Sequence, residues 1–410
     1  MKKKDSHAIH IVMKTFYFLI ISMLFFACGS HSKKNSDSIP NVKAIDDVMQ
    51  AFVDSGYIPG AVTAVVSKDN ILHLGSVGVA DYETRSPMKP DHIFWIASMT
   101  KPVTAVALLM LQDEGKLSVD DPVSKYIPEF MDLKAPSGKD ANLTITQIMN
   151  HTSGLREADA QTAMRAKELA DLIPSYVSGP TQFEPGSRWN YCQSGINTGA
   201  RIVEVVSGLR FDQFLQQRIF DPLEMSSTTF YPVWQSSTQR AAGYIKNRNN
   251  GRFEKAEVAE IFGKPDSAPL GNGGLFSTAL DYAHFAQLLL GKGIYKGKRY
   301  LSENAMTYLT SVKTGELDCG FLQEAQYGNL GANYGWGVGT CILRIPHPGV
   351  AAMLSPGSFG HGGAWGTQAW IDPVRDIAYI MMIQRPNFNS DASNIRAEFQ
   401  QKAFDELATK

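Results

Sequence analysis

The chain has 410 residues, 44% of them hydrophobic and 19% charged, with a formal net charge of −1. This is the composition of a globular protein with enough apolar material for a large core. A net charge so close to zero gives no basic surface of the kind that binds nucleic acid, so no nucleic-acid partner is predicted.

The first 27 residues differ in character from the rest of the chain. Four lysines precede an apolar run from Thr15 to Ala27, which is too short to span a bilayer comfortably. A charged flank, an apolar run and a small residue at its end indicate a secretory signal, whether translation begins at Met1 or at Met13. We therefore predict a signal peptide at 1–27 and an exported protein, periplasmic or attached to the cell envelope.

Cys28 follows Ala27 directly, and this junction resembles the cleavage box of bacterial lipoproteins, although Phe25 stands where that box usually has leucine. We expect lipidation at Cys28 and contact with a membrane through this anchor alone. The alternative is an ordinary signal peptide that ends at this cysteine. Residues 28–40 are polar and are predicted to be a flexible tether.

The remaining cysteines are Cys192, Cys319 and Cys341. Three thiols do not make a disulfide framework, although a 319–341 disulfide is possible in an exported protein. The sequence has no Cys-x-x-Cys and no His-Glu-x-x-His, so we predict no metal site and no cofactor.

The first elements predicted after the tether are a helix and a pair of strands. Apolar residues share one helical face from Val42 to Phe52, and Gly56 ends this helix. Residues 61–79 are typical of two strands joined by a turn at 68–70.

The tetrapeptide Ser-Met-Thr-Lys at 98–101 interrupts an apolar run where the next helix begins. Pro102 lacks an N–H and fits only near a first turn, which places Ser98 at the N-terminus of a helix that Gly115 ends. There the helix dipole favours an alkoxide, and Lys101 lies on the same face. A buried lysine can lose its proton near neutral pH, so the two residues are a candidate nucleophile and base. A plain helix cap is the alternative.

Ser-x-x-Lys occurs twice more, at Ser30–Lys33 and Ser86–Lys89. The first copy lies in the polar tether, and the second lies beside Pro87 and Pro90. Neither has a helix to hold the serine and the lysine one turn apart.

A long stretch rich in helices and loops follows at roughly 103–300, in which a capping box at 144–147 opens a short helix. Strand patterns return at 334–343, 366–372 and 377–383. Apolar residues at four-residue intervals then predict a final helix, at Ile395, Phe399, Ala403 and Leu407. Strands at both ends with helices between them predict an α+β fold, in which one sheet is built from both chain ends and flanked by terminal helices.

Four further segments follow the tetrapeptide in a fixed order. They are NLTITQIMNHTSGL (142–155), FEPGSRWNYCQSGINTGARIVEVVSG (183–208), GNGGLFSTALDYAHFAQLLL (271–290) and FGHGGAWGTQAWIDP (359–373). Together they resemble the class C β-lactamase-related serine hydrolases, which include penicillin-binding proteins, D-amino-acid peptidases and β-lactamase-fold esterases. The resemblance covers about 41–405. It implies a β-lactamase/transpeptidase-like domain at 41–410 with an antiparallel sheet and a helical lobe, roughly 103–300, inserted in the α/β lobe.

The second motif of that family is Tyr-x-Asn, and here it reads Tyr191-Cys192-Gln193. The resemblance implies that Tyr191 is catalytic. Gln193 takes the place of the substrate-binding amide, and it is one methylene longer than asparagine.

The third motif is usually Lys-Thr-Gly, which 313–315 matches to the letter. The chemistry needs this tripeptide on a strand, followed by another strand and the closing helix, whereas 315 is followed by a loop. His361-Gly362-Gly363 has the required strands and helix after it, and the family's esterases and peptidases often use His-x-Gly here. We therefore predict His361, Gly362 and Gly363 as substrate-binding residues.

The implied mechanism is acyl transfer through an acyl-enzyme. Ser98 attacks a carbonyl, while Lys101 and Tyr191 share the base and acid roles. By resemblance, the backbone N–H groups of Ser98 and Ala364 form the oxyanion hole.

We expect a hydrolase of small esters, amides or D-amino-acid peptides, with a small molecule or a peptide as its partner. Because His361 removes the fixed positive charge of a lysine, turnover of β-lactams should be weak. The alternative is a catalytically weak penicillin-binding or sensor module on the same fold, which Gln193 would permit.

Overall fold

The computed structural model describes residues 39–232, 239–247, 249–258, 263–320, 330–347, 353–386 and 394–407. The chain divides into two units, Met1–Ile39 and Pro40–Lys410. The predicted signal peptide, the lipidation site Cys28 and the tether up to residue 38 lie outside the described residues, and they stay predictions. In the described ranges, no helix has the length and apolar character needed to cross a membrane.

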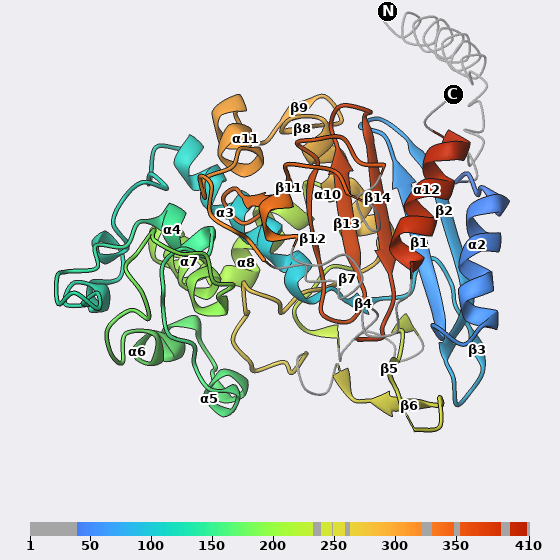
Figure 1. Cartoon of the computed structure of the whole chain (residues 1–410), viewed down its shortest axis with the longest axis horizontal. Helices are drawn as coiled ribbons and strands as arrows, with labels where there is room; N and C mark the ends of the chain where they lie inside the picture. The colour runs from blue at the N-terminus through green and yellow to red at the C-terminus, as the bar shows by residue number, and fades with distance from the viewer. Residues whose placement is uncertain are drawn as a thin grey trace, which may run out of the picture. The chain divides into compact units, whose positions relative to one another are not determined.

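Within the described residues, eight strands form one antiparallel sheet that combines both ends of the chain (Figure 1). β1 and β2 make a hairpin near the N-terminus, and the other edge of β1 pairs with β14, where Val62 lies opposite Met382. In spatial order the strands are β10 (Tyr334–Trp336), β11 (Cys341–Leu343), β12 (Phe359–Gly362), β13 (Gln368–Asp372), β14 (Ile377–Met382), β1 (Gly60–Val66), β2 (Ile71–Asp81) and β3 (Ser86–Pro87). The predicted α+β fold, with an antiparallel sheet from both chain ends, is confirmed.

The central strands are buried on both faces. Along β1, Val62 and Ala64 enter one hydrophobic cluster, while Ala61 and Val65 enter a second one. Successive side chains of a strand point to opposite faces, so this alternation means that the sheet separates two apolar layers.

The two terminal helices cover one face of the sheet, as predicted. α2 (Lys43–Asp54) and α12 (Ile395–Leu407) lie beside each other in Figure 1. Met49 of α2 and Phe399 of α12 belong to the same buried cluster as Tyr379 of β14, and the Phe399 and Tyr379 rings lie 6.4 Å apart.

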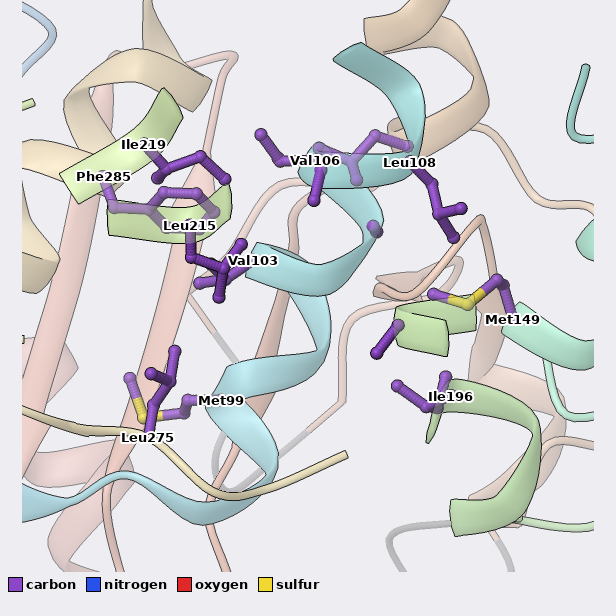
Figure 2. Close-up of a cluster of buried hydrophobic side chains, with 14 of the residues drawn as sticks. Met99, Val103, Val106, Leu108, Met149, Ile196, Leu215, Ile219, Leu275 and Phe285 are labelled. Carbon is purple, nitrogen blue, oxygen red and sulfur yellow. The ribbon is translucent and has the colours of Figure 1, made fainter. Parts of the chain in front are cut away.

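The other face of the sheet is covered by α3 (Thr100–Asp113) and α10 (Ala279–Leu290). α3 is buried from Thr100 to Leu111, as expected for a helix enclosed by other elements. Figure 2 shows Val103 of α3 near Leu215, and Met99, just before α3, near Leu275. α10 falls in the stretch expected as a helical lobe, yet it packs on β1 and β14.

The remaining helices lie between α3 and the C-terminal strands in sequence, and α7 packs against α3 and α4. The predicted capping box opens α4, since Thr144 Oγ1 accepts a hydrogen bond from Gln147 N at 3.2 Å. The helices are α4 (Ile145–Met149), α5 (Ala160–Arg165), α6 (Ile173–Tyr176), α7 (Gln193–Ser207), α8 (Phe211–Leu215) and α11 (Glu303–Thr310). The short helical segments are η1 (Ala97–Met99), η2 (Val123–Lys125), η3 (Pro128–Phe130), η4 (Leu169–Leu172), η5 (Gln216–Phe220) and η8 (Gly331–Asn333).

The middle of the chain is not wholly helical. Its described residues also form three small antiparallel pairs: β4 (Phe94–Trp95) with β7 (Phe276–Ser277), β5 (Gly243–Lys246) with β6 (Phe253–Ala256), and β8 (Ile294–Tyr295) with β9 (Lys298–Arg299). Cys192, Cys319 and Cys341 are buried free thiols, so the 319–341 disulfide that the sequence left open is not formed.

Candidate active site

Ser98 lies in the turn that leads into α3. The sequence predicted a helix from this serine onward, whereas the structure has a 3₁₀ turn at Ala97–Met99 and the α-helix begins at Thr100. Ala97, just before the serine, has φ +45°, a left-handed conformation that non-glycine residues rarely adopt. Backbone strain of this kind concentrates at functional sites, where the surrounding structure enforces it.

The Lys101 amine lies beside the Ser98 hydroxyl, as predicted. Lys101 Nζ is 3.0 Å from Ser98 Oγ, 2.9 Å from Gln193 Oε1 and 2.7 Å from the backbone oxygen of Asn272. The side chain is fully buried, and burial lowers the pKa of Lys101 to about 7. A large fraction of this lysine is therefore a neutral amine at neutral pH.

The three partners of Lys101 fit a neutral amine with its lone pair on the serine. Such an amine has two hydrogens and one lone pair. The Gln193 and Asn272 oxygens can only accept hydrogen bonds, so they take the two hydrogens. The lone pair then faces the Ser98 hydroxyl, which is the arrangement that a general base requires.

Tyr191 lies against the same amine. Lys101 Nζ is 4.7 Å from the centre of the Tyr191 ring, and the Tyr191 hydroxyl is 3.4 Å from His361 Nε2. His361 Nδ1 lies 2.6 Å from the Gly362 carbonyl oxygen. Because a carbonyl only accepts, Nδ1 carries the proton and Nε2 accepts from the tyrosine.

Both side chains are uncharged at neutral pH. Burial and the nearby Lys101 lower the pKa of His361 to about 3. Burial raises the pKa of Tyr191 above its usual range, an effect that hydrogen bonding with Ser98 and Gln193 partly offsets. Tyr191 is thus a phenol that can donate a proton.

Gln193, predicted to bind substrate, also holds the lysine. Its Oε1 accepts from Lys101 Nζ and, at 3.0 Å, from Asn272 Nδ2. Gln193 is the first residue of α7, where the Glu157 carboxylate accepts hydrogen bonds from the Gln193 N–H and, at 2.9 Å, from the Ser194 N–H. A carboxylate at a helix N-terminus satisfies N–H groups that have no partner in the helix.

The turn between β12 and β13 lies against the segment before Ser98. Thr367 Oγ1 donates to the Ile96 carbonyl oxygen at 3.2 Å, and exposed Ala364 lies within this turn. The two predicted substrate-binding glycines differ. A Cβ at Gly362 would have the Thr367 backbone oxygen as its nearest neighbour, 3.8 Å away, whereas a Cβ at Gly363 would lie 2.1 Å from Thr367 Oγ1 and 2.6 Å from the Ile96 oxygen. A side chain at Gly363 would therefore overlap its neighbours, so the fold needs glycine here, and its substrate-binding role stays a prediction.

The Lys-Thr-Gly sequence at 313–315 does not lie on a strand, as predicted. Thr314 Oγ1 accepts from the Trp336 N–H at 3.2 Å.

Three residues around the site were not predicted: His151, Glu157 and Asn272. Asn272 and His151 lie in two of the segments that carried the family resemblance, so that signal could have pointed to them. Glu157 has no motif around it, and only the fold brings it to the start of α7.

A cavity of about 500 Å³ lies next to this region. Its walls include Ile93, Trp95 and Phe276, together with the ion pair between Lys255 and Asp81. Its lining contains neither Ser98, Lys101 nor Tyr191. In the parts of the chain that the structure describes, no group of three or more His, Cys, Asp or Glu side chains could hold a metal ion.

Comparison with known proteins places these motifs in a family. The Beta-lactamase family model matches residues 45–402. Protein Rv1367c of Mycobacterium tuberculosis is 28% identical, with 83% of this chain and 89% of that protein covered. An Escherichia coli K12 protein with the provisional name D-alanyl-D-alanine carboxypeptidase is 27% identical, with 90% of each chain covered. The solved structure of EstCE1, a hydrolase with promiscuous acyltransferase activity, has a TM-score of 0.71 at 20% identity, covering 87% of this chain and 97% of EstCE1.

Proposed function

Since this chain belongs to the beta-lactamase family, we propose that it is a serine hydrolase that works through an acyl-enzyme at Ser98. The substrates would be small esters, amides or D-amino-acid peptides. The observation that carries this proposal is the buried Lys101, whose Nζ lies 3.0 Å from the Ser98 hydroxyl oxygen. The E. coli relative named as a D-alanyl-D-alanine carboxypeptidase supports the peptide class.

In the proposed mechanism, Lys101 takes the proton of Ser98 as the serine oxygen attacks the substrate carbonyl. The backbone N–H groups of Ser98 and Ala364 would stabilise the oxyanion. As the tetrahedral intermediate collapses, Tyr191, a phenol beside both groups, would donate its proton to the leaving group and recover one from the Lys101 ammonium, so that both residues are neutral again. Water would then attack the acyl-enzyme and give a proton to Lys101, and collapse of this second intermediate would return a proton through the same pair to Ser98 Oγ.

We expect weak turnover of β-lactams at most. The pKa of His361 is lowered to about 3, so this residue offers no positive charge to a β-lactam carboxylate at neutral pH. A cephalosporin kcat/KM near the diffusional limit of about 10⁸ M⁻¹s⁻¹ would contradict this expectation.

The test is labelling with a fluorophosphonate probe, together with a panel of p-nitrophenyl esters, D-aminoacyl p-nitroanilides and nitrocefin. Wild-type protein should be labelled and should hydrolyse members of the first two groups, while Ser98→Ala should do neither. Binding of β-lactams without turnover, and with no hydrolysis of any ester or anilide, would favour the penicillin-binding or sensor module instead.

Export and lipidation at Cys28 form a separate part of the proposal, supported by the sequence of residues 1–28. We expect incorporation of a labelled fatty acid into the wild type expressed in a bacterium. Cys28→Ala should lose this label and leave the membrane fraction, whereas Cys192→Ala should keep it.

A further inference from the structure

His151 is bonded to the chain on both sides of the catalytic tyrosine. Its backbone oxygen accepts from the Asn190 N–H at 2.9 Å, and its ring Nδ1 accepts from the Cys192 N–H at 3.1 Å. The residue is fully buried. One residue therefore holds the amide groups that flank Tyr191.

The imidazole ring also packs on the tyrosine ring itself. The His151 and Tyr191 ring centres are 4.5 Å apart, and the Trp336 ring meets His151 edge to face at 4.6 Å. Trp336 in turn lies 5.4 Å from the His361 ring. His151 is thus enclosed between Tyr191 and a tryptophan that packs on the tyrosine's hydrogen-bond partner.

The bond from Cys192 fixes the protonation state of His151. Because Nδ1 accepts from an amide, the ring is neutral and its proton is on Nε2. Burial, with Lys101 and His361 nearby, holds the pKa of His151 well below its ordinary range, so the acceptor persists. No described residue accepts a hydrogen bond from Nε2. The ring is therefore held by Nδ1 and by packing.

The backbone of His151 is strained in a way that serves these contacts. Its φ is +67°, in the left-handed region where residues other than glycine are uncommon. In this conformation its carbonyl oxygen and its ring both reach the segment 190–192. Strain of this kind persists where the surrounding structure over-determines it.

We propose that His151 is the positioning residue for Tyr191, holding the backbone on both sides of the tyrosine and its ring so that the hydroxyl stays beside Ser98 and Lys101. This inference rests on the proposed acyl-enzyme function. It assigns a role in that function to a residue that, within the described chain, makes no hydrogen bond to Ser98 or Lys101.

Two substitutions separate the contacts of His151. His151→Asn keeps an oxygen that can accept near the Nδ1 position and tolerates left-handed backbone, but lacks the ring. His151→Phe keeps a ring and loses the acceptor. His73 offers a matched control, since it is also fully buried and its Nδ1 accepts from the Val42 N–H at 3.0 Å, away from the site.

The first measurement is the rate of acylation by the fluorophosphonate probe in wild-type and Tyr191→Phe backgrounds. His151→Phe should slow acylation by at least about tenfold in the wild type, because small misplacements of catalytic groups are costly. In Tyr191→Phe it should add less than about twofold, since residues that act through one another are not additive. His73→Asn should leave acylation unchanged. Equal fold-changes in both backgrounds would overturn the proposal.

The second measurement does not depend on activity. Hydrogen exchange in the peptide containing the Asn190 and Cys192 amides should be faster in His151→Phe than in the wild type, and closer to wild type in His151→Asn. Unchanged exchange in His151→Phe would refute the positioning role. If the phenylalanine variant does not fold, both measurements are made on His151→Asn instead. Labelling of Ser98→Ala as strong as that of wild type would refute the proposed function instead.

Discussion

Lys101 Nζ donates a hydrogen bond to Gln193 Oε1 over 2.9 Å, which joins the first turn of α3 to the first residue of α7. This bond decides where the lysine lone pair points. With one hydrogen on Gln193 and the other on the Asn272 oxygen, the lone pair can face only Ser98. The glutamine that replaces the family's asparagine therefore orients the lysine amine.

The first prediction concerns this amide. Gln193→Leu should reduce the acylation rate by about tenfold or more, because one hydrogen bond is worth about 1 kcal/mol and the lysine also loses its orientation. The acylation rate of Gln193→Asn should lie between those of the wild type and Gln193→Leu. The rate of fluorophosphonate labelling measures the effect, with thermal melting as a check on the fold. A leucine variant as fast as the wild type would contradict the assigned role.

The second prediction is a pH dependence. The base must be neutral, and the pKa of Lys101 is about 7, so kcat/KM should rise as the pH increases through about 7 and then level off. Lys101→Arg should be inactive at every pH between 6 and 8, because arginine stays protonated. A pH profile without a rising limb between pH 6 and 8, measured with a p-nitrophenyl ester, would refute Lys101 as the base.

The same lysine predicts how stability varies with pH. Its pKa falls from the ordinary 10.5 in the unfolded chain to about 7 in the folded protein. Between these values the unfolded chain binds more protons, so the contribution of Lys101 to stability increases with pH. We expect the free energy of unfolding of the wild type, minus that of Lys101→Met, to increase from pH 7 to pH 10. Denaturant melts at both pH values measure it, and a constant difference would show that the folded pKa is not lowered.

The sequence predicted the parts of the site that depend on local structure. Ser98 lies in the 3₁₀ turn that leads into α3, Lys101 follows three residues later in the first turn of α3, and Pro102 marks that turn. Both strands after His361 and the final helix follow from their apolar patterns. Such features are carried by neighbouring residues, so they can be read without knowing the fold.

The contacts that tune the site could not be predicted in this way. Asn272 reaches Lys101 across 171 positions of the chain. Glu157 meets the N-terminus of α7, 36 positions away, from a loop without periodicity. The close approach of Ile96 and Thr367 to Gly363 does not follow from the His-Gly-Gly pattern. Each of these depends on which segments the sheet and helices bring together.

Another prediction concerns Glu157, whose negative charge raises the pKa of Lys101. Glu157→Gln should therefore lower this pKa and move the rising limb of the pH profile to lower pH, while weakening the cap of α7. Asp159→Asn is a matched control, because Asp159 caps α5 on the same loop by accepting from the Thr162 N–H at 2.9 Å. A shift of the limb to higher pH, or an equal shift in both variants, would contradict this interpretation.

The last prediction compares the two adjacent glycines of the β12–β13 connection. Gly363→Ala would place its Cβ 2.1 Å from Thr367 Oγ1 and 2.6 Å from the Ile96 backbone oxygen. The backbone must shift to relieve this overlap, at a cost of about 1–3 kcal/mol in the free energy of unfolding. The shift should also slow acylation, because the turn that carries Ala364 would move away from the segment before Ser98.

In Gly362→Ala the new Cβ would come no closer than 3.8 Å to Thr367 O, so stability should change by less than about 0.5 kcal/mol. Denaturant melts of both variants measure these costs, and equal losses of stability would show that the close approach to Ile96 and Thr367 does not constrain this turn.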